Sequence, residues 1–100
     1  MSHFNQLTPA EAERLAILAE EMGEAIQAIG KILRHGYEST NPDLPPPAGD
    51  TNRASLEREI GDVLVAIDFM LDAKDIEQFL LDDRMRVKKH RIRDYLHHQG

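Results

Sequence analysis

The sequence has no cysteine, so neither a disulfide bond nor a thiolate zinc site can hold the chain together. It also lacks any apolar run near the roughly 20 residues that a membrane-spanning helix needs. Residues 1–6 do not contain the basic and apolar regions of a secretion signal. We therefore expect a cytoplasmic protein.

Positive charge is scarce overall and is concentrated in one segment. The chain has 12 Lys and Arg against 18 Asp and Glu, for a net charge of −6, which argues against general affinity for nucleic acids. Residues 84–93 nevertheless contain six Lys or Arg and no acid. Function or an oligomeric assembly has to account for this asymmetry.

The first helix has a well-marked beginning and end. Thr8 can cap it, Pro9 suits the first helical position, and Glu11 can close a capping box. Apolar residues then recur at helical spacing, which predicts a helix over residues 8–35. Gly36 follows, and we expect it to end the helix in a left-handed conformation.

The remaining residues predict two further helices and one long loop. Helical spacing of apolar residues predicts helices over 51–73 and 76–96, the last after a turn with Asp75 as cap. Residues 37–50 hold four prolines and a glycine, which exclude regular structure. A loop of this length in a 100-residue chain suggests a functional role, although a plain spacer between antiparallel helices fits equally well.

The helix predicted over 51–73 is apolar over most of its circumference. Such a helix is buried on several sides, and three helices in one monomer cannot easily cover it. With 41% hydrophobic and 30% charged residues, the composition is that of one globular domain spanning residues 1–100. We therefore expect an all-α helical bundle that is completed by dimerisation, as a dimer or a dimer of dimers.

Two pairs of carboxylates mark the candidate site. Glu21 and Glu24 lie three residues apart on the first predicted helix, and Glu59 and Asp62 lie three apart on the second, so each pair shares one helix face. Glu21 falls at the edge of the apolar stripe, where a carboxylate needs a partner to remain charged. Packing of the two helices would gather four acids, and carboxylates with water suit Mg²⁺ or Mn²⁺.

One such pair alone is usually no more than a solvated helix face. Here the pairs recur on two helices, each beside an apolar surface and each next to a glycine, Gly23 or Gly61, that permits close approach. This combination favours a metal site. The five histidines show no ligand-like spacing apart from the terminal His97-His98, so a zinc site is not expected.

The motif E-E-x-x-E at residues 20–24, followed by E-x-x-D at 59–62, resembles the all-α nucleoside triphosphate pyrophosphatases of the MazG-like superfamily. The resemblance extends over residues 15–96, and segments 30–39 and 95–99 are similar to those of small phage and bacterial members. It implies an all-helical dimer or larger assembly that cleaves an NTP or dNTP to the monophosphate and pyrophosphate.

Carried over by position, the resemblance implies that Glu21, Glu24, Glu59 and Asp62 are magnesium ligands and that Glu20 matches a less essential acid. Between Glu24 and Glu59 lie 34 residues, more than is usual in the family, and the Pro-rich loop accounts for the excess. Attack of water on the α-phosphorus builds negative charge that Mg²⁺ neutralises. Either Glu21 or Glu24 can orient that water as a base; the sequence does not choose between them.

The candidate substrate contacts are cations for the phosphates and two side chains for the base. In the family, basic residues of the last helix help to hold phosphates, which makes Lys88 and Arg91 the preferred pair. A purine such as dGTP is a first guess at the base. The complete set is Lys31, Arg34, Lys88 and Arg91 for phosphates, with Tyr37 to stack on the base and Asn52 to hydrogen-bond its edge.

Two other readings remain open. The first is a related helical hydrolase acting on dUTP or phosphoribosyl-ATP. The second is a non-catalytic helical dimer that binds a partner or nucleic acid through its basic C-terminal helix. This second reading predicts salt-sensitive binding to DNA and indifference to Mg²⁺.

Overall fold

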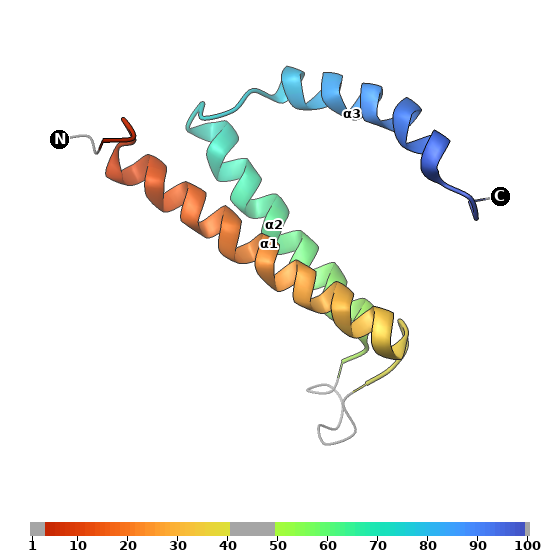
Figure 1. Ribbon diagram of the computed structural model, residues 1–100. Helices are drawn as coiled ribbons and strands as arrows, with labels where there is room; N and C mark the ends of the chain where they lie inside the picture. Colours follow the sequence, from red (N-terminus) through yellow and green to blue (C-terminus); the bar gives the residue numbers. More distant parts are fainter. Residues whose placement is uncertain (1–3, 41–49, 100) are drawn as a thin grey trace. The chain divides into compact units, whose positions relative to one another are not determined.

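The computed structural model describes residues 4–40 and 50–99, and the regular structure within these ranges is entirely helical. The elements are three α-helices and one short 3₁₀ helix (Figure 1): α1, Pro9–His35; α2, Asn52–Asp72; α3, Gln78–Ile92; η1, Arg93–Tyr95. The expected all-α class is therefore confirmed for the described residues. None of their helices is both long and apolar enough to cross a membrane.

The chain divides into two compact units, Met1–Phe69 and Met70–Gly100. The first holds α1 and most of α2, and the second holds the last residues of α2 together with α3 and η1. Each unit is described by itself below. Most of the predicted loop over 37–50 lies outside the described residues, since these stop at 40 and resume at 50.

Helix α1 begins as its local sequence predicts. The Thr8 hydroxyl accepts a hydrogen bond from the Glu11 backbone N–H at 3.1 Å, and the Glu11 carboxylate accepts one from the Thr8 N–H at 2.8 Å. With Pro9 in the first turn, this is a complete capping box. Gly36 ends the helix with φ +89° and ψ 166°, so its φ is positive as expected, but its ψ is extended rather than left-handed helical. Its N–H donates to the Ile32 carbonyl at 2.7 Å.

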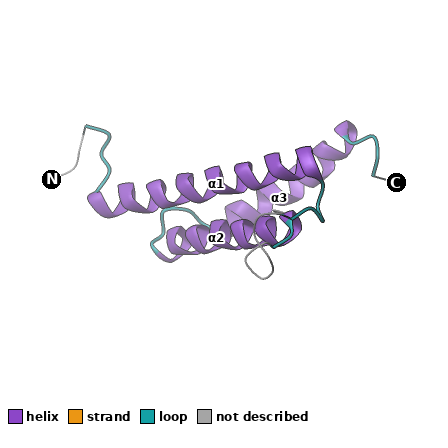
Figure 2. Cartoon of the chain, turned by 90° about the horizontal axis from the view of Figure 1, so that it is seen from below, coloured by secondary structure: helices purple, strands orange, loops and turns teal. Residues whose placement is uncertain are grey.

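Helices α1 and α2 lie side by side in both views (Figures 1 and 2). Backbone hydrogen bonds join the end of α1 to the start of α2: Asn52 N–H donates to the Ser39 carbonyl at 2.9 Å, and Arg53 N–H donates to the Tyr37 carbonyl at 2.8 Å. Thr51 caps α2, because its hydroxyl accepts from the Ala54 N–H at 3.1 Å. The two helices are thus tied together at the point where the Pro-rich segment leaves them.

Few of the described residues are buried, namely Ala28, Ala66 and Met70. Large apolar side chains stay exposed on both helices of the first unit, with exposed fractions of 67% for Ile26, 82% for Leu33 and 56% for Phe69. Burial of apolar area is the main favourable term in folding. In the described residues, much apolar surface therefore remains exposed and does not contribute to folding.

In the second unit, α3 begins two residues later than predicted. Glu77 occupies the N-cap position without a side-chain hydrogen bond, so the expected cap at Asp75 is wrong. The Asp75 N–H instead donates to the Met70 carbonyl at 2.9 Å and so helps to close the end of α2. Lys74, with φ +65°, makes the turn. The helical path runs through η1 almost to the predicted end of the last helix, over 76–96, but its final turn is 3₁₀ rather than α.

Candidate metal centre

The structure brings the four predicted acids together. Glu21 and Glu24 project from α1, and Glu59 and Asp62 project from α2. One carboxylate oxygen from each residue lies within 4.8 Å of the others. We call these four residues the carboxylate cluster. It forms because the three-residue spacing on each helix points both acids of a pair toward the neighbouring helix.

Two members of the carboxylate cluster are half-buried, Glu21 and Glu59, whereas Asp62 is exposed. The Oε2 atoms of Glu21 and Glu59 are buried and have no hydrogen-bond partner among the described residues. A buried carboxylate oxygen without a partner is costly, and such groups are normally paired or bound to a cation. A cation beside Glu21 Oε2 and Glu59 Oε2 would offset their burial. Asp62 is the member of the cluster that faces solvent.

The pKa of Glu24 also shows the effect of uncompensated negative charge in the cluster. Its pKa is raised above the usual 4.5, first by the negative charge of Glu21, then by burial, and then by a side-chain hydrogen bond and the charge of Glu59. Like charges close together disfavour ionisation, and an added cation reverses that effect. Oxygen donors of this kind suit a hard divalent cation such as Mg²⁺ or Mn²⁺.

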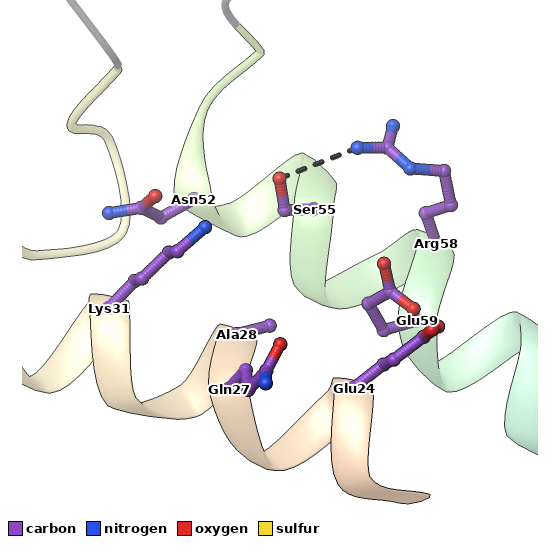
Figure 3. A pocket seen from close by; sticks show the side chains of 8 residues that line it. All are labelled: Glu24, Gln27, Ala28, Lys31, Asn52, Ser55, Arg58 and Glu59. Atoms are coloured by element: carbon purple, nitrogen blue, oxygen red, sulfur yellow. Dashed lines mark hydrogen bonds between the residues drawn. The ribbon is translucent and has the colours of Figure 1, made fainter. Parts of the chain in front are cut away.

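A cavity of about 340 Å³ adjoins the carboxylate cluster, between α1 and α2 (Figure 3). In the figure, Lys31, Gln27, Ser55 and Glu59 border one common space, with Ala28 at its base. The lining is mostly polar and carries both signs of charge. The lining residues are Glu24, Gln27, Ala28, Lys31, Asn52, Ser55, Arg58 and Glu59.

Two of the predicted substrate contacts, Lys31 and Asn52, line this cavity. The Asn52 amide nitrogen donates to the Gly36 carbonyl at 3.1 Å, so one of its two N–H donors is used within the fold. Arg34 is exposed in the last turn of α1 and does not line the cavity. Lys88 and Arg91 are exposed on α3, in the second unit, and their role stays a prediction.

Tyr37 has a partner that the sequence did not indicate. The Arg53 guanidinium lies over its ring, 4.3 Å from the centroid, and Arg53 Nε donates to a Glu38 carboxylate oxygen at 2.6 Å. This hydrogen bond is the main cause of the raised pKa of Arg53. We call Tyr37, Glu38 and Arg53 the clasp, since they join the end of α1 to the start of α2. One face of the Tyr37 ring is therefore covered.

Three cavity residues were not singled out from the sequence: Gln27, Ser55 and Arg58. A spacing signal exists for each of them. Gln27 lies three residues after Glu24, Ser55 lies four residues before Glu59, and Arg58 lies four residues before Asp62, so each shares a helix face with a cluster acid. The contact of Arg58 with Asp50 has no such signal, because Asp50 precedes the helix.

A family model, the MazG nucleotide pyrophosphohydrolase domain, matches residues 10–94. The matched range includes the whole carboxylate cluster and every residue that lines the cavity. No curated protein and no solved structure gives a match.

Proposed function

Because the chain belongs to the MazG nucleotide pyrophosphohydrolase family, we propose that it hydrolyses a nucleoside triphosphate, in the ribo or deoxy form, to the monophosphate and pyrophosphate with the help of Mg²⁺. Family membership makes it a hydrolase of nucleotide pyrophosphate bonds. The observation that carries the finer proposal is the carboxylate cluster with its two buried, unpartnered oxygens. The matched range runs through both compact units, which supports one catalytic domain over residues 1–100.

The residues present fit a magnesium site. The cluster offers four carboxylates, the donor type that Mg²⁺ prefers, and the unpartnered Oε2 atoms of Glu21 and Glu59 need positive charge. When bound, Mg²⁺ neutralises charge on the phosphate oxygens and helps to align the triphosphate. Asp62, on the exposed side, gives the site an opening through which a phosphate can approach.

The chain's own groups then act on water. Glu21 or Glu24 accepts a hydrogen bond from the attacking water and takes up its proton as the oxygen bonds to the α-phosphorus. The bond from the α-phosphorus to the bridging oxygen breaks, and pyrophosphate leaves.

The cavity beside the cluster supplies two of the proposed substrate contacts. Lys31 provides a positive charge for a phosphate. Asn52 offers its amide oxygen as an acceptor, while its nitrogen donates to the Gly36 carbonyl. Lys88 and Arg91 of α3 remain proposed phosphate ligands. Near the end of α1, Arg34 remains a proposed phosphate contact and Tyr37 a proposed base contact. Among bases, a purine such as dGTP is the first to test.

The exposed apolar side chains support a second copy of the chain as partner. Ile26, Leu33 and Phe69 are each more than half exposed on α1 and α2. Exposed apolar surface of this extent is typical of a protein interface. We therefore propose that the chain acts as a dimer or a dimer of dimers.

A substrate panel tests the proposal. The protein is incubated with each NTP and dNTP, including dUTP, and with phosphoribosyl-ATP, in the presence of Mg²⁺ and in the presence of chelator. We expect turnover of one or a few nucleotides that the chelator abolishes. Turnover of phosphoribosyl-ATP alone would move the protein to the related hydrolases. No turnover, with salt-sensitive DNA binding, would support the binding-module reading instead.

A further inference from the structure

Arg58 lies at the cavity, directly before the cluster acid Glu59 in the sequence. Its Nη1 donates to Asp50 Oδ2 at 3.1 Å, and its Nη2 donates to the Ser55 hydroxyl at 3.4 Å. Figure 3 shows the side chain extending away from Glu59, with the guanidinium directed toward Ser55. The cavity thus has one cation from each helix, Lys31 from α1 and Arg58 from α2.

The present partners hold the guanidinium only weakly. The side chains of Arg58 and Asp50 are 56% and 40% exposed, and exposed ion pairs contribute little to stability. The contact with Ser55 is at the upper limit for a hydrogen bond. A phosphate group offers more negative charge and oxygens spaced for two parallel hydrogen bonds to a guanidinium.

We propose that Arg58 is a phosphate-binding residue for the substrate, and that Asp50 holds its guanidinium until a phosphate oxygen replaces the Asp50 carboxylate. The identity of the substrate as a nucleoside triphosphate rests on the proposed function above. The exchange itself rests on the position of Arg58 at the cavity and on its paired state. Asp50 therefore acts as a competitor that lowers the affinity for the phosphate chain.

Asp50 is a suitable residue to replace because it does not cap α2. That role belongs to Thr51, whose hydroxyl accepts from the Ala54 N–H. Asp50→Asn therefore removes the carboxylate that competes for Arg58 while leaving the helix cap in place. Arg58→Gln removes the guanidinium and keeps a polar side chain, and Arg58→Lys keeps the charge but loses the two-pronged geometry.

The test is a double-mutant cycle with inorganic tripolyphosphate and Mg²⁺ as the probe. Binding is measured by calorimetry for the wild type, Asp50→Asn, Arg58→Gln and the double variant. We expect Asp50→Asn to tighten binding about two- to fivefold and Arg58→Gln to weaken it about tenfold. In the Arg58→Gln background, Asp50→Asn should change nothing, since the guanidinium for which it competes is gone. Arg58→Lys should fall between the wild type and Arg58→Gln.

A general effect of charge gives a different result. If Asp50 acted only through its negative field, its removal would tighten binding equally in both backgrounds, and that result would overturn the proposal. Unchanged affinity in Arg58→Gln, or no binding by the wild type, would overturn it as well. Asp83→Asn is the matched control, because Asp83 forms an exposed ion pair with Arg86 on α3; its affinity should equal that of the wild type.

The readout separates this proposal from the proposed function. Where the wild type turns over a nucleotide, KM should follow the tripolyphosphate affinities across the four proteins while kcat stays nearly constant. A wild type without turnover whose binding cycle behaves as expected would support Arg58 and overturn the hydrolase assignment. Turnover by the wild type, together with equal effects of Asp50→Asn in both backgrounds, would support the hydrolase assignment and overturn the proposed role of Arg58.

Discussion

Glu24 of α1 and Glu59 of α2 each place a carboxylate oxygen within 4.8 Å of the other across the contact between two helices. The pKa of Glu24 is raised, mainly by the charge of Glu21, with burial and Glu59 adding to the effect. The fold therefore gathers negative charge at a place where its own described residues supply no ion pair to balance it. A divalent cation would reverse this repulsion.

This repulsion predicts a pH dependence in chelator. The folded protein holds the Glu24 proton more tightly than the unfolded chain, where the pKa is near 4.5. The stability contributed by this group is therefore fully present below pH 4.5 and is lost as the pH rises through the folded pKa. Glu24→Gln is uncharged throughout, so it should be more stable than the wild type at pH 7 in EDTA.

Thermal unfolding in EDTA at pH 4.5 and pH 7 checks this prediction. The advantage of Glu24→Gln should grow with pH. Glu13→Gln, which removes an exposed charge from the same helix outside the cluster, serves as the control and should show little such growth. An equal melting temperature for wild type and Glu24→Gln at pH 7 would show that the cluster is not under electrostatic strain.

Magnesium should stabilise the wild type. At a concentration a hundred times the dissociation constant, a ligand that binds only the folded state adds about 2.7 kcal/mol. Asp62→Asn should lose most of this gain because it removes one of four charged oxygen donors. Melting temperatures over a Mg²⁺ titration provide the measurement. Asp68→Asn, an exposed acid on α2 outside the cluster, should keep the full gain.

The clasp should contribute to stability through its stacking contact. Arg53→Ala removes both the guanidinium over Tyr37 and the hydrogen bond to Glu38, so the melting temperature should fall by a few degrees. Tyr37→Phe keeps the aromatic face and should remain close to the wild type. Arg86→Ala, which breaks an exposed pair on α3, is the comparison. A drop in Tyr37→Phe as large as in Arg53→Ala would mean that stacking is not the relevant contact.

The exposed apolar side chains predict an assembly. Light scattering coupled to size exclusion should give a mass of at least two chains, and the melting temperature should rise with protein concentration. Ile26→Asp introduces a charge at a side chain that is 67% exposed, so it should shift the mass toward one chain. A wild type that elutes as a monomer at every concentration would refute this part of the proposal.

Much of the fold was accessible from the sequence because its determinants are local. The start of α1 depends on Thr8, Pro9 and Glu11, which lie within four residues of one another and form the expected capping box. The start of α3 differs from the prediction because the chain after α2 forms a turn in which Lys74 and Asp75 donate to carbonyls of α2, so the next helix begins only at Gln78. Periodicity alone does not reveal such a turn. The pairing of acids on two helices followed from their three-residue spacing.

The rest of the site depends on how the end of α1 meets the start of α2. Arg53 and Glu38 are 15 residues apart, and Arg58 and Asp50 are eight apart. Neither separation corresponds to neighbours on a helix face. Their contacts arise only once the chain between α1 and α2 has closed, so the clasp and the paired state of Arg58 required coordinates.

We propose cleavage between the α- and β-phosphates, with the carboxylate cluster as the group that would hold magnesium. The most direct measurement is chromatography of the products formed from a turned-over triphosphate with Mg²⁺, by the wild type and by Asp62→Ala. We expect monophosphate and pyrophosphate in equal amounts from the wild type, and no turnover by Asp62→Ala, which should keep its helicity. Diphosphate and phosphate from the wild type, or full activity in Asp62→Ala, would contradict it.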